Sequence, residues 1–102
     1  MDVEKMVAEY KKHFTKNDFL SEFRKGMEGV AERNPNVAEI ARGVAARLHY
    51  TSPCEDVAAI DSELLEIQDI LEGEARRKRN WGDLRLVAGF RTLLPHMFEV
   101  IL

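Results

Sequence analysis

The chain has little of the material from which disulfide-rich, β-rich or membrane-spanning proteins are built. Its single cysteine excludes an intramolecular disulfide, and with only three histidines it supplies too few ligands for a structural zinc site. Six glycines and three prolines provide few turns for a many-stranded β fold. No apolar run reaches the roughly 18 residues of a membrane-spanning helix. We therefore expect a soluble helical domain that works without a metal, a cofactor or a membrane.

The composition is that of one folded domain. Hydrophobic residues make up 45% of the chain and charged residues 32%, which excludes a disordered or collagen-like chain. A length of 102 residues suits one domain, so we predict a single domain over residues 1–102. Asp2 and Glu4 stand where a signal peptide has basic and apolar residues. We therefore expect a cytoplasmic protein in which Cys54 is reduced.

The net charge of −3 conceals a segregation of charge along the chain. Residues 53–75 contain eight acids and no base, whereas residues 76–102 contain six bases and two acids. The acids of the first block are Glu55, Asp56, Asp61, Glu63, Glu66, Asp69, Glu72 and Glu74. An acidic stretch thus runs directly into a basic one, and the whole chain lacks the excess of bases typical of a nucleic-acid-binding domain.

Apolar residues recur at helical spacing in five segments, which predicts an all-α fold, a compact bundle of four to five helices. We place the helices at residues 2–14, 18–33, 35–50, 53–79 and from 83 onward. Thr15 or Asn17 is suited to cap the second helix, whose Gly26 and Gly29 either permit close helix packing or weaken it.

Two further helix starts are marked by proline. Asn34 and Pro35 predict the start of the third helix, which we expect to be the central and most buried one. Ser52 and Glu55 form a capping-box pattern that starts the fourth helix near Pro53.

The fourth and fifth helices each pose a packing problem. A fourth helix of 27 residues would be about 40 Å long, whereas a compact domain of this size is about 33 Å across. It should therefore break near Gly73, project from the domain or pack against a second copy. Pro95 should kink or divide the fifth helix.

Two apolar surfaces favour contact with another protein. The fourth helix carries a heptad seam, and the C-terminal segment has apolar residues on more than one face, with Leu86, Phe90, Leu93 and Met97 off its main stripe. Three alternatives are open for the surplus of apolar residues in this segment: burial within the monomer, a homodimer interface, or a groove that holds another protein. The residues expected at the contact are Leu64, Ile67, Leu71, Leu94, Met97, Phe98 and Ile101.

The leading hypothesis is therefore a non-enzymatic interaction module of the regulatory, inhibitor or accessory-subunit type. We expect it to self-associate, with a homodimer as one form. The acidic face of the fourth helix would steer a basic partner toward it.

The basic segment after residue 75 supports a second hypothesis. Exposed bases contact phosphates and an aromatic ring stacks on a base, so the segment would bind RNA or DNA. The residues concerned are Arg76, Arg77, Lys78, Arg79, Trp81 and Arg85. The alternatives are an acidic protein partner, or a solvated helix end in which Glu72 pairs with Arg76 and Glu74 with Lys78.

A third hypothesis concerns Arg91 and His96. Their Arg-x4-His spacing resembles the catalytic motif of HEPN-type RNases, a family of small helical domains that are often dimeric. The resemblance covers six residues and implies that His96 acts as the acid/base while Arg91 stabilises charge on the cleaved phosphate. Two residues depart from the family pattern, because Thr92 replaces the usual Asn and Pro95 precedes the histidine.

Overall fold

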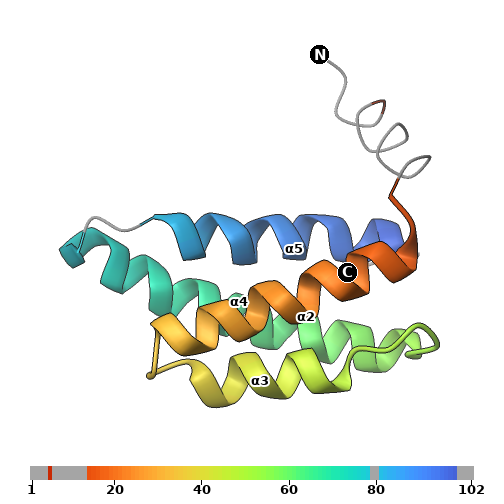
Figure 1. Ribbon diagram of the computed structural model, residues 1–102, viewed down its shortest axis with the longest axis horizontal. Helices are drawn as coiled ribbons and strands as arrows, with labels where there is room; N and C mark the ends of the chain where they lie inside the picture. The colour runs from red at the N-terminus through yellow and green to blue at the C-terminus, as the bar shows by residue number, and fades with distance from the viewer. Residues whose placement is uncertain (1–4, 6–13, 79–80, 99–102) are drawn as a thin grey trace.

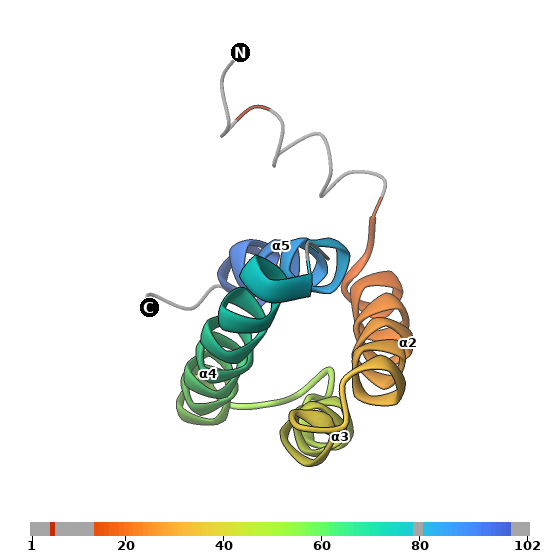
Figure 2. The same cartoon turned by 90° about the vertical axis from the view of Figure 1, so that its left-hand side faces the viewer.

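Four α-helices run side by side in the described part of the chain (Figure 1). The computed structural model describes residue 5 and residues 14–78 and 81–98. The helices are α2 (Lys16–Arg33), α3 (Ala38–Arg47), α4 (Cys54–Lys78) and α5 (Gly82–Phe98). Seen end-on, they surround a common interior in chain order, and α5 closes the ring against α2 (Figure 2). This confirms the predicted all-α bundle; the helix predicted over residues 2–14 lies mostly outside the described residues.

A capping box starts α2, as the threonine in the sequence suggested. The hydroxyl of Thr15 accepts a hydrogen bond from the Asp18 amide at 3.1 Å, and the Asp18 carboxylate accepts one from the Thr15 amide at 3.0 Å. The hydrogen bonds that the Thr15 amide and the Thr15 hydroxyl donate to the Asp18 carboxylate hold the pKa of Asp18 below its usual value. Thr15 rather than Asn17 is therefore the cap.

The start and the burial of the third helix differ from the prediction. Asn34 caps the end of α2, because its backbone amide donates to the Val30 carbonyl at 2.9 Å. A turn follows, so α3 begins only at Ala38. With ten residues α3 is the shortest of the four described helices, and it buries only three of them. It lies at the side of the bundle against α2 and α4, not at its centre.

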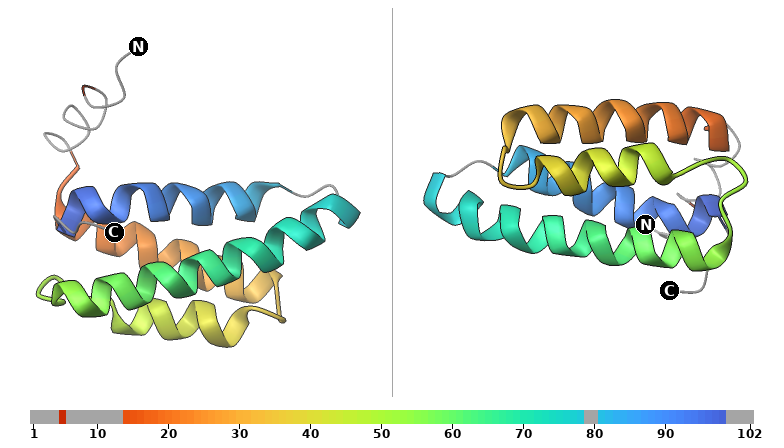
Figure 3. Two further views of the ribbon diagram at one scale, coloured as in Figure 1. Left: turned by 180° about the vertical axis from the view of Figure 1, so that it is seen from behind. Right: turned by 90° about the horizontal axis from the view of Figure 1, so that it is seen from below.

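The length of α4 needs neither a break nor a projection to be accommodated. The helix has 25 residues and continues through Gly73 to Lys78. Its length of about 37 Å equals the longest dimension of the structure, 37 Å, because α4 runs along the bundle axis (Figure 3). The helix begins at Cys54, one residue after the predicted start at Pro53. The Ser52 hydroxyl accepts a hydrogen bond from the His49 amide, which lies in the loop before the helix.

Pro95 does not divide α5, which continues to Phe98. The proline removes one backbone donor in the last turns of the helix, where few further hydrogen bonds depend on it.

Aromatic side chains pack between α2 and α5 in the core. The ring centroids of Phe23 and Phe90 lie 5.2 Å apart and those of Phe19 and Phe90 lie 6.1 Å apart, both in edge-to-face geometry. No helix of the described residues is long and apolar enough to cross a membrane.

Candidate protein-contact surface

Most of the residues predicted to contact a partner lie in the core of the single chain. Leu64, Ile67 and Leu94 are fully buried, and Leu71 and Phe98 are at least nine-tenths buried. The heptad seam of α4 faces inward because α3 and α5 lie on either side of it. A partner that docks on the folded chain does not reach these side chains, which corrects the expected contact surface. Met97 is half-buried at the edge of the core, and Ile101 lies outside the described residues.

The apolar surplus of the C-terminal segment resolves into two stripes on α5. Val87, Leu94 and Phe98 point into the core. The second stripe turns toward α2 and solvent, and within it Leu86 is 36% exposed while Leu93 is partly buried. Within residues 14–78 and 81–98, the surplus is therefore only partly covered.

This second stripe forms one wall of an apolar groove whose other wall is α2. We call this hollow of about 420 Å³ the α2/α5 groove. Its lining is Phe14, Phe19, Glu22, Lys25, Gly26, Leu86, Phe90 and Leu93. Six of these eight residues are apolar or glycine, and the two charged ones both belong to α2. The groove therefore combines an apolar floor with a charged rim, as protein contact surfaces often do.

Gly26 determines how closely α5 approaches α2 at this groove. A Cβ atom on Gly26 would lie 2.7 Å from two ring atoms of Phe90 and 3.4 Å from a methyl of Leu86. Only glycine therefore leaves room for the Phe90 ring, which in turn packs against Phe23. Of the two interpretations of Gly26, close helix packing is confirmed. Sequence reasoning named Leu86, Phe90 and Leu93 as off the main stripe but did not select them as the contact.

The acidic block of α4 is partly neutralised within the chain. Asp61 pairs with Arg91, Glu63 with Arg47, and Glu72 with Arg76 at 3.1 Å, the last as the sequence predicts. Glu74 accepts a hydrogen bond from the Asn36 amide at 2.8 Å. The remaining acids, Glu55, Asp56, Glu66 and Asp69, are exposed.

The predicted phosphate-contacting residues lie where α4 passes into α5, at one end of the bundle (Figure 1). Arg76, Arg77 and Lys78 are exposed in the last turn of α4. Trp81 is 40% exposed just before α5, and Arg85 is exposed near the start of that helix. Arg79 lies outside the described residues. The fold thus gathers these described bases at one end of the bundle, where Lys78 borders a small hollow of about 20 Å³ between α4 and α5.

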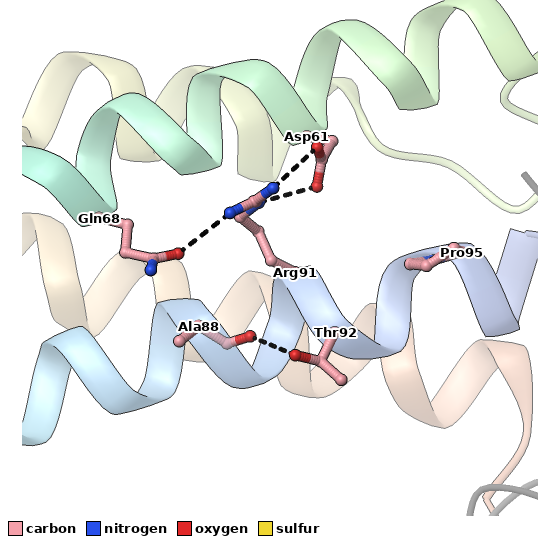
Figure 4. A pocket seen from close by; sticks show the side chains of 6 residues that line it. All are labelled: Asp61, Gln68, Ala88, Arg91, Thr92 and Pro95. Atoms are coloured by element: carbon pink, nitrogen blue, oxygen red, sulfur yellow. Dashed lines mark hydrogen bonds and ion pairs between the residues drawn. The ribbon is translucent and has the colours of Figure 1, made fainter. Parts of the chain in front are cut away.

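Arg91 and His96 do not meet at one site. Arg91 reaches from α5 to α4, where its guanidinium donates to Asp61 at 3.0 and 3.4 Å and to Gln68 at 3.4 Å (Figure 4). The charge of Arg91 is therefore compensated by a carboxylate of the same chain. Pro95 lines the same hollow of about 340 Å³, whereas His96 is exposed and does not line it.

Another interhelical ion pair ties the end of α2 to the start of α5. Arg33 donates to both carboxylate oxygens of Asp83, at 2.7 to 3.1 Å, and the Asn34 side chain donates to the same carboxylate at 2.8 Å. The hydrogen bonds from Arg33 are the main reason that the pKa of Asp83 lies below its usual value. Sequence reasoning identified Asp83 only as a possible cap. We assign the cluster a structural role, because it closes the α2–α5 seam beside the groove.

Among the described residues, no three or more His, Cys, Asp or Glu side chains form a group that could hold a metal ion. Comparison of the chain with protein-family models, with curated proteins and with solved structures finds no match.

Proposed function

We propose that the chain is a cytoplasmic, non-enzymatic protein-interaction module of the regulatory, inhibitor or accessory-subunit type. It binds an apolar helical segment of a partner in the α2/α5 groove. One observation carries the proposal: α5 has a second apolar stripe that the described part of the chain leaves partly open, with Leu86 36% exposed beside a hollow of about 420 Å³. Exposed apolar grooves rimmed by polar residues are typical of protein contacts.

The spacing of the stripe indicates the shape of the ligand. Leu86, Phe90 and Leu93 follow one another at i, i+4 and i+7, so they form a straight apolar wall along α5. A helix laid along this wall offers its own apolar residues at matching intervals. Full burial of one leucine side chain contributes about 1.5–3 kcal/mol, so two or three such residues offset a large part of the roughly 4–15 kcal/mol that association costs.

The test uses two leucines of similar exposure. Leu86 is 36% exposed in the groove, whereas Leu65 is 40% exposed on α4, outside it. The tagged protein and its Leu86→Glu and Leu65→Glu variants are used to co-purify partners from the native host, which mass spectrometry then identifies. We expect a partner that the parent protein and the Leu65→Glu variant retain and the Leu86→Glu variant loses. A partner set that is the same for all three proteins contradicts the proposal.

Nucleic-acid binding at the basic end is the second candidate function. It is favoured by the exposure of Arg76, Arg77, Lys78 and Arg85 around the 40%-exposed Trp81. Removing one side chain that binds a phosphate should reduce the slope of log affinity against log salt concentration by about one.

We propose to measure that slope for single-stranded and duplex probes, with Arg77→Ala as the variant. Arg42→Ala serves as the control, because Arg42 is an exposed arginine on α3 that pairs with Glu28. Absence of binding at low salt, or equal slopes for both variants, removes this candidate.

A further inference from the structure

We propose that the α2/α5 groove is occupied by a second copy of this chain, in a two-fold symmetric contact. The inference rests on the proposed function, because it names the partner of the same groove. In a two-fold contact, residue i of one copy meets residue j of the other and residue j meets residue i. The surface must therefore be complementary to itself, both in shape and in charge.

The shape of the groove meets this requirement. It contains a hollow lined by the half-buried Gly26 and Leu93, above the buried rings of Phe19 and Phe90, and beside it the more exposed Leu86. Gly26 places no side chain in the hollow, and Leu86 leaves more than a third of its surface uncovered. Two copies related by a two-fold axis can each insert Leu86 into the hollow of the other. The monomer thus provides both halves of the contact.

The charges on the rim meet the requirement as well. Glu22 and Lys25 lie on the groove wall of α2, three residues apart and both exposed, with opposite sign. If α2 of one copy runs antiparallel to α2 of the other about a point between these residues, Glu22 faces the second copy's Lys25, and Lys25 faces its Glu22. A parallel arrangement would oppose like charges. Of the two-fold arrangements, the rim therefore favours the one in which the two α2 helices run antiparallel.

These two rim charges are also free to make such a contact. Within residues 14–78 and 81–98, neither Glu22 nor Lys25 takes part in an ion pair or a side-chain hydrogen bond. By contrast, the acids of α4 that border other helices, such as Asp61 and Glu63, are paired within the chain. Unpaired opposite charges beside an open apolar hollow fit a second copy better than a uniformly charged partner.

Sedimentation equilibrium over a concentration series tests the inference on the full chain. We expect a monomer–dimer equilibrium for the parent protein. The Leu86→Glu variant should dissociate at least about tenfold more readily, because a buried leucine becomes a charge. The Leu65→Glu variant should match the parent. Circular dichroism before each run verifies that the variants are folded.

A charge exchange tests the two-fold orientation. Glu22→Lys and Lys25→Glu should each weaken the dimer by roughly three- to tenfold, since each places like charges face to face. The double variant Glu22→Lys/Lys25→Glu should recover the parent affinity. An equimolar mixture of the two single variants should form mixed dimers in preference to either homodimer, because one rim is then wholly basic and the other wholly acidic.

The outcomes separate this inference from the proposed function. A parent protein that stays monomeric at every concentration overturns the second copy as occupant. A dimer that Leu86→Glu leaves unchanged, or one without preference in the mixture, overturns it as well. If the Leu86→Glu variant nevertheless loses a captured partner, the interaction module stands with a different protein in the groove. If it loses no partner either, both proposals are wrong.

Discussion

Replacing Gly26 by alanine should destabilise the fold, although alanine is the better helix former. In an α-helix, alanine is favoured over glycine by about 0.8–1.0 kcal/mol. Against this gain, the new Cβ would lie 2.7 Å from two atoms of the Phe90 ring, where ordinary contacts begin at 3.4 Å. The ring must move by several tenths of an ångström, yet it is 8% exposed and in contact with Phe19 and Phe23. Overpacking of this kind costs about 1–3 kcal/mol.

Gly73 provides the matched control within α4. A Cβ on Gly73 meets no atom within 4 Å, so Gly73→Ala keeps the helix-propensity gain without the clash. We expect this variant to be more stable than the parent by about 1 kcal/mol, which corresponds to a rise in Tm of roughly 4–8 °C. The two variants should therefore differ by about 1–3 kcal/mol, and that difference isolates the overpacking cost at Gly26.

Urea unfolding followed by circular dichroism measures both free energies of unfolding, and unchanged m values show that the variants are comparable. Phe90→Leu alone and together with Gly26→Ala completes a double-mutant cycle, in which the smaller side chain at position 90 should remove most of the cost of the alanine. If Gly26→Ala proves as stabilising as Gly73→Ala, the Phe90 ring is not held against α2, and the close approach of α5 to α2 at Gly26 is contradicted.

Substitutions at Leu64, Asp83 and the Arg91/His96 pair each test one contact or one residue pair of the described fold. Leu64→Ala should lower the free energy of unfolding by about 2–5 kcal/mol, whereas Leu65→Ala should change it by less than about 0.5 kcal/mol in the same urea titration; equal effects would place the α4 seam outside the core. Because the pKa of Asp83 is lowered in the fold, its stabilising contribution is present above the ordinary carboxyl value and lost below it. The stability gap between the parent and Asp83→Asn should therefore shrink as the pH falls below about 4, and a gap independent of pH contradicts this. Arg91→Ala and His96→Ala should leave any activity on single-stranded RNA unchanged in a gel assay, since the two residues do not line one hollow, and a loss with both would restore the RNase hypothesis.

The local features of this chain could be predicted because each depends on residues near to one another in sequence. Apolar spacing marked the helices 18–33 and 53–79 to within two residues at either end. The capping pattern at Thr15 and the Glu72–Arg76 pair also form between residues three or four positions apart. The predicted start of the third helix at Asn34 and Pro35 is wrong, because asparagine is favourable at the end of one helix as well as at the start of the next.

The position of the contact surface depended on packing between residues far apart in the chain. Heptad spacing indicates that one face of α4 is apolar, but not whether that face meets helices of the same chain or of another. On α5 the sequence shows two apolar stripes and cannot rank them, because their burial depends on where α2 and α4 lie. The structure turns Leu94 inward and leaves Leu86 partly open.

Sequence alone thus determined the helical class, the approximate span of the described helices and the separation of acidic from basic residues, all of which follow from local spacing and composition. Only the tertiary structure decided which leucines are core, which acids are neutralised and why residue 26 is glycine. Most of these depend on contacts between residues far apart in the chain, such as Gly26 with Phe90 or Asp61 with Arg91, whereas the Glu72–Arg76 pair is local. Periodicity within one helix carries no information about such partners.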